Sequence, residues 1–93
     1  MAHRKAPQSA EVLALKALNF LGNSENGLNR FLLGADMQPQ ALAARIEEPG
    51  VQAAILDFLL SDEALLLEFC GAESLQPKDI HLAKYRLDGS PDY

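Results

Sequence analysis

Residues 18–42 of this chain are repeated, without a gap, as residues 56–80, so equivalent positions lie 38 residues apart. Eight of the 25 aligned positions are identical. Chance would give roughly two or three in a chain this rich in leucine and alanine, and a fixed period of this size is typical of a repeated supersecondary unit. The identical pairs are Leu18/Leu56, Phe20/Phe58, Leu21/Leu59, Glu25/Glu63, Leu28/Leu66, Phe31/Phe69, Gln38/Gln76 and Pro39/Pro77. The chain is therefore predicted to fold as two related units.

The composition favours helices over strands. Ninety-three residues, 48% of them hydrophobic, are enough for one domain with a buried core. Leucine and alanine, which favour helix, dominate, whereas strand-forming residues are scarce: two valines, three isoleucines and no threonine or tryptophan. We predict an all-α fold of five to six short helices, arranged as two pseudo-repeated three-helix units packed into one compact bundle. Residues 51–60 are apolar nearly all round, which predicts that their helix lies at the centre.

Glycine, proline and polar residues indicate where the helices begin and end. Pro39, Pro49 and Pro77 are predicted to open helices, because a missing N–H costs nothing at the first helical position. Gly34 is predicted to end the second helix as its C′ residue. Asn23 or Ser24 is expected to cap the beginning of that helix.

These signals divide the chain into one domain and two tails. We assign residues 1–9 to a disordered N-terminal tail, 10–89 to a single helical domain and 90–93 to a C-terminal tail. Within the domain, repeat unit one is predicted to span 11–47 and repeat unit two 49–87.

Charge and cysteine content restrict the class of protein. The net charge is −5, and the second half of the chain carries the whole acidic excess. A basic field is what phosphate binding requires, so the charge argues against nucleic acid as a partner. A lone Cys70 fits a reducing compartment, and the sequence shows no signal peptide and no membrane span. We expect a cytoplasmic protein.

Few residues suggest chemistry. Cys70 aligns with Leu32 on an apolar helix face, so we interpret it as a small buried hydrophobic residue. The two histidines, His3 and His81, lack the spacing of a metal motif, and the acidic residues lack that of a calcium loop. The pattern predicts no catalytic residue, no metal, no cofactor and no small-molecule substrate. We predict that the chain is not an enzyme.

The second copy of the repeat has gained leucines. Positions occupied by Gly22, Gly27 and Asn29 in the first copy hold Leu60, Leu65 and Leu67 in the second. Either these leucines pack between the two units, or they form an exposed apolar patch that binds a partner. Leu65 and Leu67 are two residues apart and cannot both lie deep on one helix face. The predicted partner-binding residues are Leu60, Leu65 and Leu67 with the acidic Glu63 and Glu68.

The leading hypothesis is a non-catalytic protein-interaction module whose partner is another protein or a second copy of the chain. The alternative is a small nucleic-acid-associated regulator that uses the basic tail, with Arg4 and Lys5, and the last helix. In that helix the basic and aromatic candidates are Lys78, His81, Lys84, Tyr85 and Arg86.

Several segments also resemble one known family. The run from Ile55 to Glu63, followed by Leu65–Leu67 and Phe69, is similar to small alphaproteobacterial proteins of domain-of-unknown-function family 3572. So are Ala17–Leu21, Arg30–Leu32 and Pro39–Leu42, and the resemblance covers residues 10–89. It implies a helical, cytoplasmic, bacterial protein and supplies no catalytic or ligand-binding residue.

Overall fold

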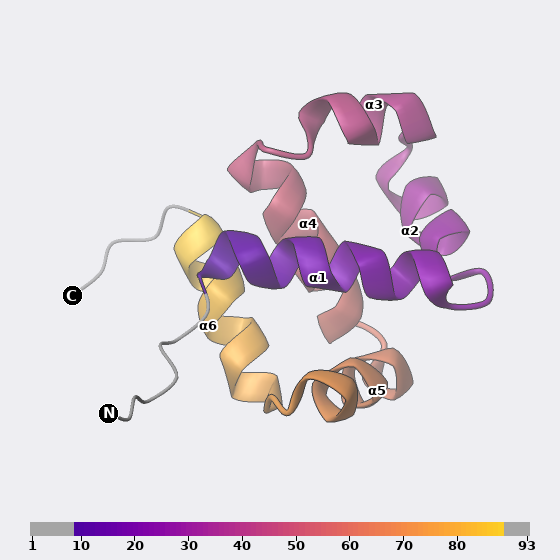
Figure 1. Ribbon diagram of the computed structural model, residues 1–93. Helices are drawn as coiled ribbons and strands as arrows, with labels where there is room; N and C mark the ends of the chain where they lie inside the picture. The colour runs from indigo at the N-terminus through magenta and orange to yellow at the C-terminus, as the bar shows by residue number, and fades with distance from the viewer. Residues whose placement is uncertain (1–8, 89–93) are drawn as a thin grey trace.

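The computed structural model describes residues 9–88, which form six α-helices and no strand (Figure 1). The helices are α1 (Ala10–Asn23), α2 (Gly27–Ala35), α3 (Pro39–Arg45), α4 (Pro49–Leu60), α5 (Glu63–Glu73) and α6 (Pro77–Leu87). The predicted all-α bundle of short helices is confirmed. No helix within this part of the chain is both long and apolar enough to cross a bilayer.

The two predicted tails lie outside the described residues, with one exception. Ser9 was assigned to the N-terminal tail, but its hydroxyl accepts a hydrogen bond of 3.0 Å from the backbone N–H of Val12. Ser9 is therefore the N-cap of α1, because it satisfies one of the N–H groups that the first turn leaves without a partner.

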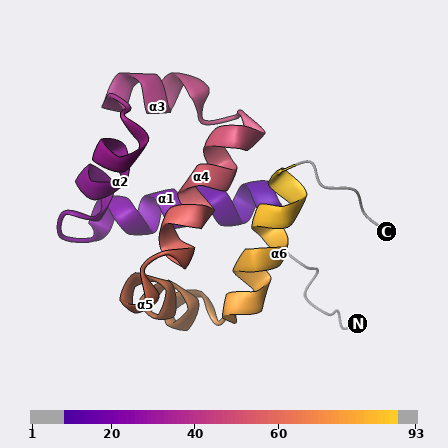
Figure 2. The same cartoon turned by 180° about the vertical axis from the view of Figure 1, so that it is seen from behind.

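Helix α4 lies at the centre of the bundle, as its apolar pattern predicts. It packs on α1, α2, α5 and α6, and α1 and α6 also pack on each other. Figures 1 and 2 show α2 and α3 at one end of the molecule and α5 at the other, with α1 and α4 between them. The buried residues of α4 are Val51, Gln52, Ala53, Ile55, Leu56 and Leu59.

Two aromatic contacts link the predicted units reciprocally. Phe20 of α1 lies against Phe69 of α5, with ring centroids 5.4 Å apart. Phe31 of α2 lies against Phe58 of α4, with centroids 5.7 Å apart. Phe20 and Phe58 are equivalent positions of the repeat, and so are Phe31 and Phe69. The two contacts therefore involve the same pair of equivalent positions, with the two units exchanged. This exchange is the pattern that two like units produce when they pack about an approximate two-fold axis.

The second helix of each predicted unit ends in the same way. Asp36 after α2 and Ser74 after α5 are equivalent positions, and both adopt left-handed backbone with φ of 55° and 58°. The following N–H groups, of Met37 and Leu75, each donate to the carbonyl five residues earlier. This arrangement satisfies carbonyl groups that the last helical turn leaves open.

Two predicted helix ends are wrong. Gly34 lies within α2, and the left-handed C′ position falls two residues later, at Asp36. The N-cap position of α2 is Asn26, whose side chain makes no capping hydrogen bond. The side chains of Asn23 and Ser24 instead donate to carbonyl groups of α1, those of Asn19 and Phe20. The proline signals are confirmed, since Pro39, Pro49 and Pro77 each occupy a first turn.

The third helices of the two units differ. Helix α6 packs on α1, α4 and α5, whereas α3 is shorter and Leu42 is its one buried residue. The division into units 11–47 and 49–87 stays a prediction, because the reciprocal contacts involve only the first two helices of each unit.

Loss of the Phe69 side chain should destabilise the bundle strongly. Phe69 is fully buried and contacts the other unit through Phe20. We expect Phe69→Ala to lower the free energy of unfolding by about 3–5 kcal/mol, measured by urea denaturation. Leu33→Ala, at a side chain that is 81% exposed, is the control and should change it by less than about 0.5 kcal/mol. Equal effects of the two variants would contradict this packing.

Candidate functional site

Helix α5 begins at a defined cap and buries one narrow face. The carboxylate of Asp62 accepts a hydrogen bond of 3.2 Å from the backbone N–H of Leu65. Leu66, Phe69 and Cys70 recur at helical spacing and are buried. Their burial turns the opposite side of the helix to solvent. We call this side the α5 outer face; it consists of Glu63, Ala64, Leu67, Glu68, Gly71 and Ala72, all of which are exposed.

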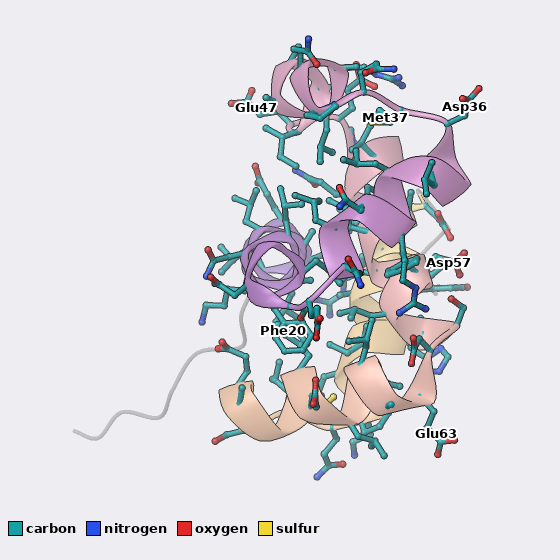
Figure 3. The ribbon with its side chains drawn as sticks, turned by 90° about the vertical axis from the view of Figure 1, so that its right-hand side faces the viewer. Phe20, Asp36, Met37, Glu47, Asp57 and Glu63 are labelled. Carbon is teal, nitrogen blue, oxygen red and sulfur yellow. The ribbon has the colours of Figure 1, made fainter. Side chains whose placement is uncertain are left out.

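The five predicted partner-binding residues divide into two groups. Leu60 and Leu65 are half-buried and pack against the core. Leu67 is 53% exposed on the α5 outer face, together with Glu63 and Glu68. Figure 3 shows Glu63 at the corner of the molecule, directed away from the bundle. The last three residues are the exposed members of the predicted set, and whether any of the five binds a partner stays a prediction.

Local packing explains one of the differences between the copies. A Cβ atom added at Gly27 would lie 2.9 Å from the Ser24 Cβ and 3.2 Å from the Leu21 carbonyl oxygen. Glycine is therefore required where α2 begins close to the end of α1. The equivalent Leu65 lies inside α5, which begins two residues earlier, and is free of this restriction.

Two ion pairs attach α5 to the first half of the chain. The guanidinium of Arg30 donates a hydrogen bond of 2.9 Å to the Asp62 carboxylate and lies 5.6 Å from the centroid of the Phe58 ring. Lys16 of α1 lies 3.4 Å from the Glu73 carboxylate. Within residues 9–88, by contrast, neither Glu63 nor Glu68 has a cationic partner. Glu63 lies in the first turn of α5, where the helix dipole favours an acidic side chain, and neither carboxylate is paired with a basic side chain among the described residues.

The hydrogen bond from Arg30 lowers the pKa of the Asp62 carboxyl, and the backbone N–H of Leu65 lowers it further. At Cys70, burial raises the pKa of the thiol, and the negative charge of Asp79 adds to the effect. Cys70 is 4% exposed, so the prediction of a buried hydrophobic cysteine is confirmed. A protonated, covered thiol is a poor nucleophile.

Helix α6 presents a second exposed stripe. Burial of Ile80 and Ala83 turns its other side outward. We call this side the α6 outer face; it consists of Lys78, His81, Leu82, Tyr85 and Arg86, all exposed. Lys84, the fifth residue of the predicted basic and aromatic set, is not part of this face. It donates a hydrogen bond of 3.0 Å to Asp88, and this bond raises the pKa of its ammonium group. A shallow surface hollow of about 420 Å³ runs along the side of α6, lined in part by His81, Leu82 and Tyr85.

The other hollows offer little for chemistry. A groove of about 240 Å³ between α2 and α4 has Asp57 as its single carboxylate; it is lined by Phe31, Gly34, Ala35, Ala54, Asp57, Phe58 and Ser61. Figure 3 shows Asp57 at the outer edge of α4. Another groove, between α2 and α3, contains Asp36. No group of three or more His, Cys, Asp or Glu side chains that could hold a metal is found among the described residues.

Three residues shape the surface and core in ways that the sequence pattern does not predict. Gln52 is buried and donates a hydrogen bond of 2.9 Å to the Ile46 carbonyl, which attaches α4 to the end of the first unit. Arg30 pairs with Asp62 across the units, and nothing in the 38-residue spacing indicates this contact. Leu33 is the most exposed large apolar residue described, although its apolar type alone suggests core.

Comparison with known proteins identifies a family but no relative of known activity. The family model described as a protein of unknown function (DUF3572) matches residues 7–90. No curated protein and no solved structure matches the chain.

The Arg30–Asp62 pair should make the bundle sensitive to acid. Because the folded pKa of Asp62 is lowered, the stability it contributes is fully present above about pH 4, near the unfolded value, and is lost as the pH falls through the folded value. Asp62→Asn, which can keep the cap, should flatten the acid limb of a plot of urea midpoint against pH.

Arg30→Met should flatten the same limb, because it removes the main cause of the shift. The control is Lys78→Met, since Lys78 has no carboxylate partner within residues 9–88. An acid limb that is identical in Asp62→Asn and the wild type would refute the assigned role of this pair.

Proposed function

This chain belongs to the DUF3572 family, and we propose that it is a non-catalytic protein-interaction module of the bacterial cytoplasm. It binds its partner through the α5 outer face. A lone, buried Cys70 fits a reducing compartment. The bacterial origin is proposed from the resemblance that the sequence analysis gives for residues 10–89.

The exposure of Leu67 between two carboxylates carries this proposal. Leu67 is 53% exposed, and its burial by a partner would contribute roughly 1–2 kcal/mol. Glu63 and Glu68 flank it and add specificity for a partner of opposite charge. The small side chains of Ala64 and Ala72 allow a partner to approach the helix backbone closely. The partner surface should therefore be apolar with basic residues at its edge.

The variant Leu67→Asp should weaken association without unfolding the bundle. An exposed side chain can become charged at little cost to folding, whereas the same charge inside an apolar contact is costly. We expect binding to weaken about tenfold or more while the circular dichroism spectrum is unchanged. The control is Leu33→Asp, an exposed leucine at the other end of the molecule. If Leu67→Asp unfolds the chain, Leu67 belongs to the core.

Partner capture gives the direct readout. A photo-crosslinking amino acid placed at position 67 should yield a covalent adduct in the cells that make the protein, and the same group at position 33 should not yield that adduct. Absence of any adduct at position 67 would refute the proposed function.

A second proposal is a nucleic-acid-associated regulator, favoured by the exposed Lys78, His81 and Arg86 on one face of α6. Two features weaken it: Lys84 is paired with Asp88, and Asp57 lies close enough to act on Lys84 electrostatically. The basic tail with Arg4 and Lys5 lies outside the described residues. A fluorescence titration with duplex DNA at low salt tests the idea, and it fails if no salt-dependent binding occurs at about 10–100 μM.

A further inference from the structure

The α5 and α6 outer faces have the same helical spacing but differ in the size and charge of their side chains. On α5, the residues Ala64, Leu67, Glu68, Gly71 and Ala72 follow the pattern i, i+3, i+4, i+7, i+8. On α6, the residues Lys78, His81, Leu82, Tyr85 and Arg86 follow the same pattern. Each set forms one continuous stripe along its helix, and all ten residues are exposed.

The stripes are complementary in size. Helix α6 presents two large apolar side chains, Leu82 and Tyr85, which are 50% and 42% exposed. Helix α5 presents small residues around Leu67. Large side chains of one helix pack into the spaces that small residues leave on another, and this allows close contact between helices.

The absence of a side chain at Gly71 is not required by the bundle itself. A Cβ atom added there would meet nothing within 4 Å, and glycine is a poorer helix former than alanine. The opposite holds at Gly27, where the added atom would clash with Ser24. Space at Gly71 is thus available to a group that approaches from outside.

The stripes are also complementary in charge. The α5 outer face carries Glu63 and Glu68, and the α6 outer face carries Lys78 and Arg86. Within residues 9–88 none of these four side chains takes part in an ion pair. An apolar centre with opposite charges at its edge is the arrangement found in specific protein interfaces.

We propose that the partner of the α5 outer face is the α6 outer face of a second copy of this chain. This inference rests on the proposed function and names its partner. Helices α5 and α6 follow each other through three residues, 74–76, and pack on each other, so the two faces lie on adjacent helices. The contact then occurs twice about a two-fold axis, with α5 on the partner's α6 and α6 on the partner's α5.

Reversal of the charges on one face at a time tests the proposal. One variant carries Glu63→Lys and Glu68→Lys, and the other carries Lys78→Glu and Arg86→Glu. In either variant alone, like charges face each other at both contacts, so the dissociation constant of the dimer should rise at least about tenfold. In an equal mixture, every contact between the two variants joins opposite charges. The mixture should therefore regain a mass of twice the 10.1 kDa chain in light scattering.

A steric pair of variants checks the same contact without a change of charge. Gly71→Leu fills the space on the α5 outer face and should abolish the dimer, while helicity measured by circular dichroism is kept or increased. Gly22→Leu is the matched control, because Gly22 is also an exposed helical glycine whose added Cβ meets nothing within 4 Å. It should leave the dimer intact.

The outcomes separate this inference from the proposed function. A wild-type chain that stays at 10.1 kDa up to millimolar concentration overturns the self-contact, and so does a mixture of the two charge variants that does not associate. An adduct at position 67 with a different protein would then keep the proposed function and replace the partner. If the wild-type chain is a monomer that binds DNA, and the Lys78→Glu, Arg86→Glu variant does not bind it, then the α6 outer face is a nucleic-acid-binding surface instead.

Discussion

The burial of α4 is the constraint on which the rest of the structure depends. A helix that is apolar nearly all round is stable in water only if other helices cover most of its sides. Helices α1, α2, α5 and α6 provide that cover, and each turns its own apolar stripe inward to do so. Each covering helix is therefore left with one outer side that the bundle does not use. The residues on those outer sides are not determined by the core, and this makes them informative about contacts beyond the chain.

The two reciprocal phenylalanine contacts explain why the halves of the chain fold together. Phe31 of the first unit lies against Phe58 of the second, and Phe20 lies against Phe69 in the equivalent contact. Both ring–ring contacts found within residues 9–88 join the two halves, so separating the halves would remove both of them. Arg30 adds a polar link at one of these contacts, because it lies over the Phe58 ring and pairs with Asp62. This link has no counterpart at Phe20, where the position equivalent to Asp62 is Ser24.

Local signals in the sequence predicted most of the fold and only part of the surface. Proline at a first helical turn and apolar spacing of three and four residues act within one helix, so the sequence alone predicts where most helices begin and which face they bury. The nearly uniform apolar character of residues 51–60 likewise predicts the central position of α4. The end of α2 was misplaced because Asp36, and not Gly34, adopts the left-handed conformation, which aspartate tolerates better than most residues do. The different exposure of Leu60, Leu65 and Leu67 could not be predicted from the sequence. The burial of Leu60 depends on how α4 turns about its axis when it packs, and that of Leu65 and Leu67 on how α5 does. The pairing of Arg30 with Asp62 also depends on tertiary packing, because the two residues lie far apart in the chain, whereas the hydrogen bond of Gln52 depends on the turn between α3 and α4.

The divergence of the two copies at exposed positions argues for a contact outside the bundle. Asn29 and Leu33 on α2 are equivalent to Leu67 and Gly71 on α5, and all four are exposed. Core packing therefore does not distinguish between these residue types at either pair. In the second copy the polar residue has become leucine and the large residue has become glycine, which creates an apolar side chain beside open space. The change to leucine raises the helix propensity of this position, whereas the change to glycine lowers it, so helix propensity does not explain the two changes together. The pair makes physical sense if another helix lies on this face, with Leu67 against its side and Gly71 beneath one of its large residues.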